Sequence, residues 1–459
     1  MSNLREIVAE QENWVEIRYH KREKVNIEIK NGMVTKANTK TLAGAGIRCL
    51  VDGCWGFIAT SDTSRSGLEK GVDEAIKAAE IGSEIKEDKI DKLVVGELAR
   101  GEFNYVDTEN ESEPSLEEKL NLFLEIESEM RDNEIIAAGL MNYSQFNDDK
   151  IIVNSDGASA KIHDVKRDLG LTAIGISEGK QEMGSASAGT TGSWQDLFAE
   201  KSLADLKDKA VKIAQQKLKA DYAPGGKYTV ILDPMLVGIL SHEAIGHTVE
   251  ADFVSSGSIV KGKIGEKVAS DLITMVDDGT AQKTSGMTMV DDEGVLAQRT
   301  VIIKDGILKN YLHNRESAES FSTKPLGNAR AFTYRDEPLI RMTNTFILPG
   351  ESEVTEMIAG IEDGFYLKGL GQGGQADANA EFMFGVQEAY RIKDGEIKEP
   401  VKGITISGQA FEVLQSVDAV GNDFQFALGR GYCGKGQPAK VDAGGPHIRC
   451  QVTIGGQQE

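Results

Sequence analysis

The 459-residue sequence predicts an α+β fold, in which an N-terminal α/β-type region of small sheets and helices precedes a mostly antiparallel β domain carrying one active-site helix. Three observations indicate this. Strand-like stretches joined by short turns open the chain, amphipathic helical stretches follow, and the second half is glycine-rich and strand-like except for one segment with two histidines. The stretch "DYAPGGKY" is typical of a boundary, so we expect domains at residues 1–222 and 223–459.

The first hundred residues alternate between apolar and polar side chains. "WVEIRYH" and "VNIEIK" are expected to form strands, and Asn31-Gly32 predicts a tight hairpin turn into "MVTKANTK". Helices are expected at 64–82 and 115–132, where apolar residues recur at helical spacing. Ser115 and Glu118 have the spacing of a capping box at the start of the second helix.

Further elements complete the expected scaffold. Short strands separated by turn residues are predicted over 134–192, and an amphipathic helix over 202–220. Lys-Asp-Gly recurs at 304–306 and 393–395 between strand-like arms, which predicts two more hairpins with two-residue turns. We interpret these hairpins as scaffolding and not as sites of chemistry.

The charge balance excludes some classes of partner. Lysine and arginine number 51 against 73 aspartate and glutamate residues, which gives a net charge of −22. A surface of this sign repels phosphate backbones and anionic lipids, so we expect no nucleic-acid and no membrane ligand. The first residues are charged where a signal peptide needs an apolar core, and no stretch approaches about 18 uncharged apolar residues. The sequence therefore predicts a cytoplasmic protein.

Four cysteines are too few for a disulfide framework in a chain of this length, and a cytoplasmic setting would keep them reduced. Cys49 and Cys54 lie in an apolar stretch and are expected in the core. Cys450 alternates like a strand residue, which also favours the core. Cys433 lies in the glycine-rich loop "GRGYCGKGQP" beside Lys435, where backbone amides and a cation would favour the thiolate that a metal needs.

The segment "SHEAIGHTVEAD", residues 241–252, carries the strongest chemical signal. It is preceded by a predicted buried strand, with Asp233 as helix N-cap and Pro234 at the first helical position. His242 and His247 are five residues apart, so a regular α-helix would point them about 140° apart and could not aim both at one ion. A π-bulge, which absorbs one extra residue per turn, would bring them together, and Gly246 favours one. We therefore predict a departure from α geometry at residues 244–247.

Two interpretations of the segment remain open at this point. The histidines are either metal ligands or ordinary polar residues satisfied by hydrogen bonds. A catalytic zinc takes three protein ligands and leaves one position for water, and the helix supplies two. Cys433 is the preferred third ligand, whereas Glu250 is expected to orient a ligand histidine by a hydrogen bond without binding the metal itself. The full set of candidates is Glu250, Asp252, Cys433, Cys450, His20, His163, His313 and His447.

Several motifs of the second half occur together and in a characteristic order: "HEAIGHTVEAD", "MVDDGT", "DDEGV", "RMTNTFILPG", "SGQAFEVLQSVDAVGND" and "CGKGQP". In these motifs the chain resembles the TldD/PmbA family of zinc peptidases, on its metal-binding TldD side. The resemblance implies zinc bound by His242, His247 and Cys433, with Glu243 as the catalytic carboxylate. It also implies a peptide or unfolded-polypeptide substrate, and a homodimer or a heterodimer with a related subunit that lacks the metal motif.

Three functional hypotheses follow. In the first, the protein is a metallopeptidase in which zinc activates a water molecule and Glu243 is the general base. In the second, it is a binding or assembly subunit with a structural metal, which would require four protein ligands. In the third, Cys433 and His247 form a cysteine hydrolase, which would need an orienting carboxylate and leaves Glu243 without a role.

Overall fold

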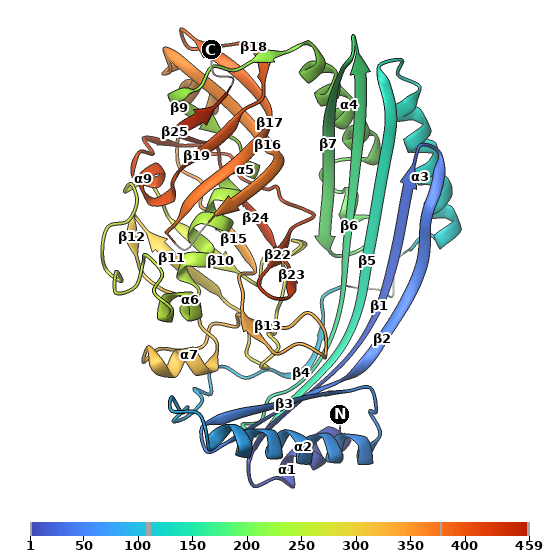
Figure 1. The fold of residues 1–459 in the computed structure, drawn as a ribbon, viewed down its shortest axis with the longest axis vertical. Helices are drawn as coiled ribbons and strands as arrows, with labels where there is room; N and C mark the ends of the chain where they lie inside the picture. Colours follow the sequence, from blue (N-terminus) through green and yellow to red (C-terminus); the bar gives the residue numbers. More distant parts are fainter. Residues whose placement is uncertain (1, 107–111, 377–378, 457–459) are drawn as a thin grey trace.

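The computed structural model describes residues 2–106, 112–376 and 379–456. Figure 1 shows a tall, curved sheet from the N-terminal half, with the C-terminal part packed along one side of it. Strands outnumber helices in both parts, and the α+β class predicted from the sequence is confirmed.

One sheet dominates the N-terminal half of the described chain. Its strand order is β3-β2-β1-β5-β6-β4, and β7 pairs with the other end of β6. Neighbouring strands are antiparallel except for β4 beside β6. The strands are β1 Trp14–Lys30, β2 Met33–Val51, β3 Cys54–Thr60, β4 Arg100–Asn104, β5 Ile136–Asn154, β6 Ser159–Ser177 and β7 Lys180–Thr191.

The prediction of small sheets and short strands in this half is wrong. β1 is a single strand of 17 residues, and β5 and β6 have 19 residues each. Charged residues break the apolar alternation of β1, but the strand continues because these side chains are paired across it. Arg22 donates two hydrogen bonds of 2.6 Å to Asp148 of β5, and His20 Nε2 lies 3.0 Å from the same carboxylate. Buried polar groups that find partners are compatible with a long strand.

Helices flank this sheet: α1 Ser2–Ala9, α2 Arg65–Ser83, α3 Leu116–Arg131 and α4 Leu203–Lys219. In Figure 1, α3 lies on the side opposite the C-terminal part, while α1 and α2 lie beside β3 at the lower end. The predicted helices are confirmed, including the capping box of Ser115 and Glu118. No helix within the described residues is long and apolar enough to cross a membrane.

Two larger sheets form the C-terminal part of the described chain. One has the order β16-β9-β25-β19-β17-β18-β8, with β20 also on β25, and the other has the order β12-β11-β10-β15-β24-β21. The pairings are mostly antiparallel, as predicted. The strands of the first sheet are β8 Asp221–Tyr222, β9 Gly226–Leu232, β16 Asp363–Ala376, β17 Glu381–Lys393, β18 Glu396–Lys402, β19 Thr405–Gln409, β20 Ala419–Val420 and β25 Ile448–Gly455.

The second sheet and two short pairs complete the strands of this part. The second sheet contains β10 Met275–Asp278, β11 Arg299–Lys304, β12 Ile307–Leu308, β15 Asn344–Ile347, β21 Gln425–Phe426 and β24 Asp442–Gly445. The short pairs are β13 Ala329–Arg330 with β14 Leu339–Ile340, and β22 Tyr432–Gly434 with β23 Pro438–Lys440. The helices are α5 Pro234–Ile239, α6 Ala251–Ser255, α7 Arg315–Ser320, α8 Val354–Ala359 and α9 Ala410–Gln415.

The three predicted two-residue turns are present. Asn31 and Gly32 have φ values of 51° and 73°, and the Asp-Gly pairs after Lys304 and Lys393 have similar positive values. Positive φ at both turn positions is the backbone geometry that Asn or Asp before Gly tolerates. These turns join β1 to β2, β11 to β12 and β17 to β18.

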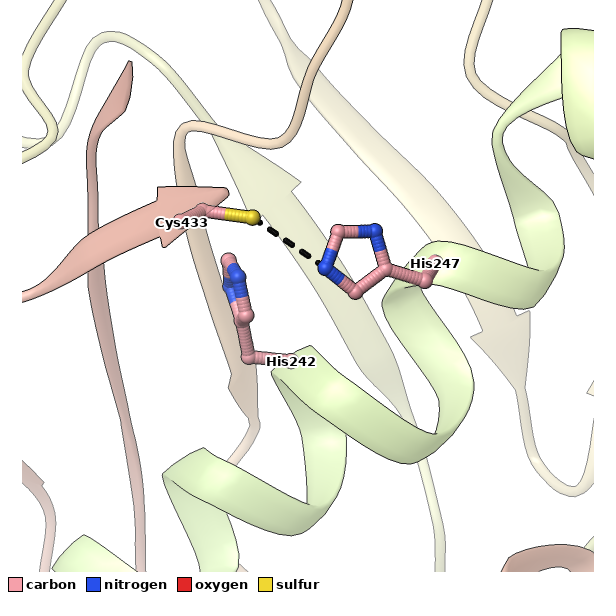
Figure 2. Close-up of side chains that lie close together, drawn as sticks. All are labelled: His242, His247 and Cys433. Atoms are coloured by element: carbon pink, nitrogen blue, oxygen red, sulfur yellow. Dashed lines mark hydrogen bonds between the residues drawn. The ribbon is translucent and has the colours of Figure 1, made fainter. Parts of the chain in front are cut away.

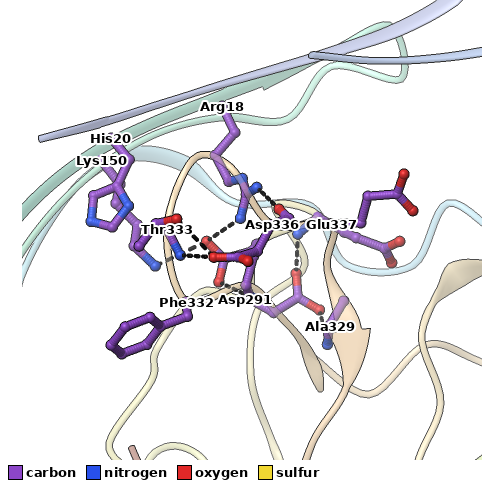
Figure 3. Close-up of polar contacts among 12 residues, drawn as sticks. Arg18, His20, Lys150, Asp291, Ala329, Phe332, Thr333, Asp336 and Glu337 are labelled. Atoms are coloured by element: carbon purple, nitrogen blue, oxygen red, sulfur yellow. Dashed lines mark hydrogen bonds and ion pairs between the residues drawn. The ribbon is translucent and has the colours of Figure 1, made fainter. Parts of the chain in front are cut away.

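Buried charges join the long sheet to the C-terminal part. Figure 3 shows Arg18 and Lys150 reaching from the sheet toward the loop that carries Phe332, Thr333 and Asp336. Arg18 and Lys150 both pair with Asp292, at 3.4 Å and 2.9 Å, and Arg18 also donates to the Asp336 carbonyl. Burial raises the pKa of Asp292, but the two cations hold it well below its usual range. The two parts are therefore held together by ionised groups inside the protein.

Candidate metal centre

A strand and a modified helix position the two histidines. After β9, the Asp233 side chain accepts a hydrogen bond from the Leu236 amide, and Pro234 begins α5, as the sequence predicts. The chain then forms a π-helix at Leu240–Gly246 and one 3₁₀ turn at His247–Val249. The predicted departure from α geometry is confirmed. The wider turn brings His242 and His247 together, with ring centroids 5.3 Å apart and planes at 81°.

Gly246 is required by packing and not by its backbone angles. Its φ of −56° is ordinary for a helix. A Cβ at this position would lie 1.9 Å from the sulfur of the buried Met342 and 3.2 Å from the Ser241 carbonyl. The π-turn can therefore approach its neighbour only because residue 246 has no side chain.

Cys433 completes a compact group of three side chains. One donor atom each from His242, His247 and Cys433 lie within 4.8 Å of one another, and within the described residues this is the one such set of histidine, cysteine or carboxylate side chains. Figure 2 shows the sulfur and both rings turned toward a common point, with Cys433 Sγ 3.1 Å from His247 Nε2. The geometry can hold one metal ion.

The β22–β23 hairpin that carries Cys433 is anchored on two sides. Arg341 is fully buried and donates to the carbonyls of Cys433 and Gln437, at 2.6 Å and 2.7 Å. On the other side, Asp168 of β6 accepts hydrogen bonds from the Tyr432 hydroxyl and the Lys440 ammonium, at 3.0 Å and 3.2 Å. The hairpin is therefore fixed to the long N-terminal sheet as well as to its own part.

The two histidines control the ionisation of Cys433. Burial raises the pKa of this thiol, but its interactions with His242 and His247 outweigh burial and lower the pKa to about 5. Burial lowers the pKa of His247, whereas its contacts with Cys433 and Glu250 raise it to about 10. The sequence-based expectation that Lys435 and exposed amides favour the thiolate is wrong. Cys433 is buried, and the Lys435 ammonium bonds to Glu250 and Asp252 instead.

The donor set fits zinc. Both ring nitrogens of His242 are buried and lack a hydrogen-bond partner among the described residues. Leaving a buried polar atom without a partner costs about 1–3 kcal/mol, so such atoms ordinarily signal a missing ligand. Two imidazole nitrogens and one thiolate are a donor set that Zn²⁺ accepts, and three protein ligands leave one position open.

Glu243 lies at the edge of this group. Its Oε2 is 3.7 Å from His247 Nε2, and its side chain is 36% exposed. Among the described residues it makes no hydrogen bond that would hold it away from the centre. Glu243 is therefore a water-accessible carboxylate close to one of the three donors.

The other candidate ligands lie outside the group. Glu250 Oε2 is 3.0 Å from His247 Nδ1, the ring nitrogen that faces away from Cys433, so it orients this histidine. Cys450 is buried in β25, and burial raises the pKa of its thiol above the usual range. Cys49 and Cys54 are core residues, as predicted. The four remaining histidines have other neighbours: Asp148 for His20, Asp149 for His163, Ser317 for His313, and Asp423 with Tyr366 for His447.

Three models of the PmbA/TldA metallopeptidase family match the chain. Domain 1 matches residues 15–79, the central domain 109–218 and the C-terminal domain 225–456. The chain belongs to the PmbA/TldD metallopeptidase family. The division into two domains at residue 222 stays a prediction, and β8, at this boundary, pairs with β18 of the C-terminal part.

Curated relatives of this PmbA/TldD family member are named as metalloproteases. A metalloprotease of Methanothermobacter thermautotrophicus is 34% identical over 443 residues, covering 94% of this chain and 93% of its own length. The zinc metalloprotease TldD homolog of Saccharolobus solfataricus is 30% identical over 427 residues, covering 90% of each chain. These names support a peptidase-type function.

Solved structures share the fold. TldE from Thermococcus kodakarensis superposes with a TM-score of 0.79 at 19% identity, covering 99% of both chains. A Thermotoga maritima protein described as a candidate modulator of a DNA gyrase has the same TM-score at 21% identity and the same coverage. At this level of identity the likeness establishes the fold alone.

Proposed function

We propose that this protein is a zinc-dependent peptidase in which His242, His247 and Cys433 hold the metal and Glu243 is the general base. The observation that carries the proposal is the arrangement of four side chains: three donor atoms within 4.8 Å of one another, and the Glu243 carboxylate 3.7 Å from His247 Nε2. The unpartnered nitrogens of His242 add support, because buried polar atoms of this kind call for a partner and a metal ion would supply one.

In the proposed reaction three residues bind the metal and Glu243 transfers protons. Zinc, when bound, supplies a Lewis acid that makes water more acidic and polarises a peptide carbonyl. His242, His247 and the Cys433 thiolate fix its position from two rigid segments. Glu243 takes a proton from the attacking water and returns a proton to the leaving amine. An activated water needs no separate nucleophilic side chain, and Glu243 then has a defined role. In the cysteine-hydrolase alternative Glu250 would be the carboxylate that orients His247, but Glu243 would have no role.

Extended peptides or unfolded segments are the substrate that we propose. His242 and Cys433 are only 1% and 3% exposed, so the surface of a folded protein could not reach them. A flexible chain can present a single peptide bond to the more exposed edge of the group, where Glu243 and His247 lie, and be held by backbone pairing to strands.

The remaining parts of the proposal concern the assembly and the compartment. We propose a homodimer, or a heterodimer with a related subunit that lacks the metal motif. The structural likeness to TldE is compatible with a related partner of the same fold. A cytoplasmic location is supported by four free, buried cysteines, since a reducing compartment keeps such thiols intact.

Replacement of Glu243 by glutamine tests the function directly. Glutamine keeps the shape of the side chain but cannot accept a proton, so the variant should bind zinc like the parent while hydrolysis falls about 10²–10⁴-fold. The assay would follow cleavage of a mixed pool of unstructured peptides, with a chelator control and with folded proteins as resistant substrates. Glu102→Gln, which changes an exposed carboxylate on β4, is the matched control and should cleave like the parent.

Two results would count against the peptidase. Equal cleavage by parent and Glu243→Gln would point to another mechanism or a contaminant. Peptide binding without cleavage by either protein, alone or with a related subunit, would favour the binding-subunit hypothesis with a structural metal. The second hypothesis requires a fourth protein ligand, and the described residues place three donors in the group.

A further inference from the structure

Glu250 is a buried carboxylate directly behind the metal group. It is 0% exposed, and its Oε2 lies 3.0 Å from His247 Nδ1 and 3.0 Å from Lys435 Nζ. The Lys435 ammonium forms an ion pair with this carboxylate, so Glu250 is the acceptor in both contacts. An ionised carboxylate only accepts hydrogen bonds, so the Nδ1 atom of His247 must carry the proton. This leaves Nε2, the ring nitrogen that faces Cys433, as the atom whose lone pair a metal would take in place of a proton.

Lys435 holds this carboxylate in place. An ammonium group has three hydrogens, and Lys435 Nζ has three acceptors: Glu250 Oε2 at 3.0 Å, Asp252 Oδ1 at 2.8 Å and the Ile340 carbonyl at 3.0 Å. It also lies over the ring of Phe253, 4.3 Å from the centroid. The side chain is 12% exposed. With every donor used and little exposure, Lys435 is arranged for a fixed internal role and not for capture of a substrate.

The Lys435–Glu250 pair links the two segments that carry the donors. Lys435 is two residues after Cys433 on the hairpin, and Glu250 is three residues after His247 at the end of the modified helix. The paired residues are 185 positions apart in the chain. Any displacement of the hairpin from the helix would stretch this ion pair together with the contact between Cys433 and His247.

We propose that Lys435 is a positioning residue for the metal centre: through Glu250 it fixes the tautomer and direction of His247, and it holds the Cys433 hairpin against the helix. This inference rests on the proposed zinc site and deepens it. Without Lys435 the buried carboxylate would lose its ammonium partner and could turn away from His247. Removing a side chain that orients a metal ligand typically weakens metal affinity about 10- to 100-fold.

The test measures zinc affinity on the purified full-length protein. Lys435→Met removes the charge and keeps the length of the side chain, so the Zn²⁺ dissociation constant, measured by competition with a chromogenic chelator, should rise about 10- to 100-fold. Lys435→Arg should recover part of the affinity, because arginine keeps the charge. Lys261→Met is the matched control, since Lys261 is exposed and donates only to the Ser255 carbonyl; its affinity should equal that of the parent.

A double-variant cycle separates positioning from general destabilisation. In a Glu250→Gln background, Lys435→Met should reduce zinc affinity by a smaller factor than in the parent, because the part of its effect that passes through Glu250 is already absent. With Co²⁺ as the probe, Lys435→Met should still develop the thiolate-to-cobalt absorption band at saturation, whereas Cys433→Ala should lose it. Circular dichroism and the thermal midpoint of the metal-free variants report folding independently.

The outcomes are distinct. Zinc affinity of Lys435→Met equal to the parent, while Cys433→Ala binds poorly, would overturn the positioning role and leave the zinc site standing. An equal loss in the parent and Glu250→Gln backgrounds would likewise overturn it, because Lys435 would then act elsewhere. A parent protein that binds zinc no better than Cys433→Ala would overturn both the inference and the proposed function.

Discussion

His247 Nε2 lies 3.1 Å from Cys433 Sγ, although the two residues are 186 positions apart in the chain. The contact joins a helix that is modified to aim two histidines at one point and a hairpin anchored by buried arginine and aspartate side chains. Both supports are held by buried contacts. The donor atoms are therefore arranged in advance, which is the arrangement that a tight metal site requires.

The two buried cysteines of the C-terminal part should respond differently to replacement. Cys433→Ser should sharply reduce bound zinc, because the thiolate is one of three donors, whereas Cys450→Ser should stay near the parent level. Metal analysis of the purified proteins by mass spectrometry measures both. Equal zinc content in the two variants would remove Cys433 from the site.

Gly246→Ala should destabilise the protein by about 1–3 kcal/mol, since the added methyl group overlaps Met342 in a packed core. Gly82→Ala in α2 is the matched control, because its Cβ would meet nothing closer than 3.9 Å. Alanine at a compatible helical position should leave stability unchanged or raise it by about 1 kcal/mol at most. Urea unfolding of the metal-free proteins gives both values, and equal stability of Gly246→Ala and parent would mean that Met342 moves aside freely.

Asp292→Asn should cost about 3–5 kcal/mol of unfolding free energy, because it leaves the buried Arg18 and the partly buried Lys150 without their carboxylate. The exposed pair of Lys161 and Glu102, at 3.4 Å, gives the comparison: Glu102→Gln should cost no more than about 1 kcal/mol. Chemical denaturation measures the difference. A small effect at Asp292 would show that water reaches this interface and screens the charges.

The buried His313 should make the folded protein less stable in mild acid. It is buried, and burial lowers the pKa of its imidazole from 6.5 to about 4. Between these values the unfolded chain binds a proton that the folded chain excludes, so stability falls as the pH falls from about 6.5 to about 4, by up to about 1.4 kcal/mol per pH unit. The unfolding free energies of the parent and of His313→Gln should approach each other as the pH is lowered through this range. Parallel curves would exclude His313 as the titrating group.

Local sequence patterns predicted much of this structure. The helix caps at Ser115 and Asp233, the two-residue turns and the irregular turn between His242 and His247 each depend on a few adjacent residues. The preference for Cys433 over Cys450 also came from local context, namely a glycine loop against a strand-like alternation. Such features are visible without knowledge of the tertiary fold.

Long-range contacts explain what the sequence did not predict. The apolar alternation of β1 is interrupted at its charged residues, and nothing near them in the sequence shows that Arg22 is paired, because its partner Asp148 is 126 positions away. The sequence places Lys435 beside the Cys433 thiolate, and only the folded chain shows that its partners are Glu250 and Asp252. No local pattern marks Asp168 as the anchor of the hairpin. Pairings between distant segments leave no periodic signal in a single sequence.

The attachment of the Cys433 hairpin to Asp168 has a consequence for biosynthesis. A ribosome adds about 5–20 residues per second, so the thiol follows His247 by roughly 10 to 40 s of translation. During that interval the nascent chain contains both histidines but not their third donor. Asp168 then also lacks its hydrogen-bond partners Tyr432 and Lys440. The peptidase that we propose would thus stay inert while its own unfolded segments, and those of neighbouring ribosomes, are within reach. Competence would begin only when the last donor has docked onto the part of the chain that was made first.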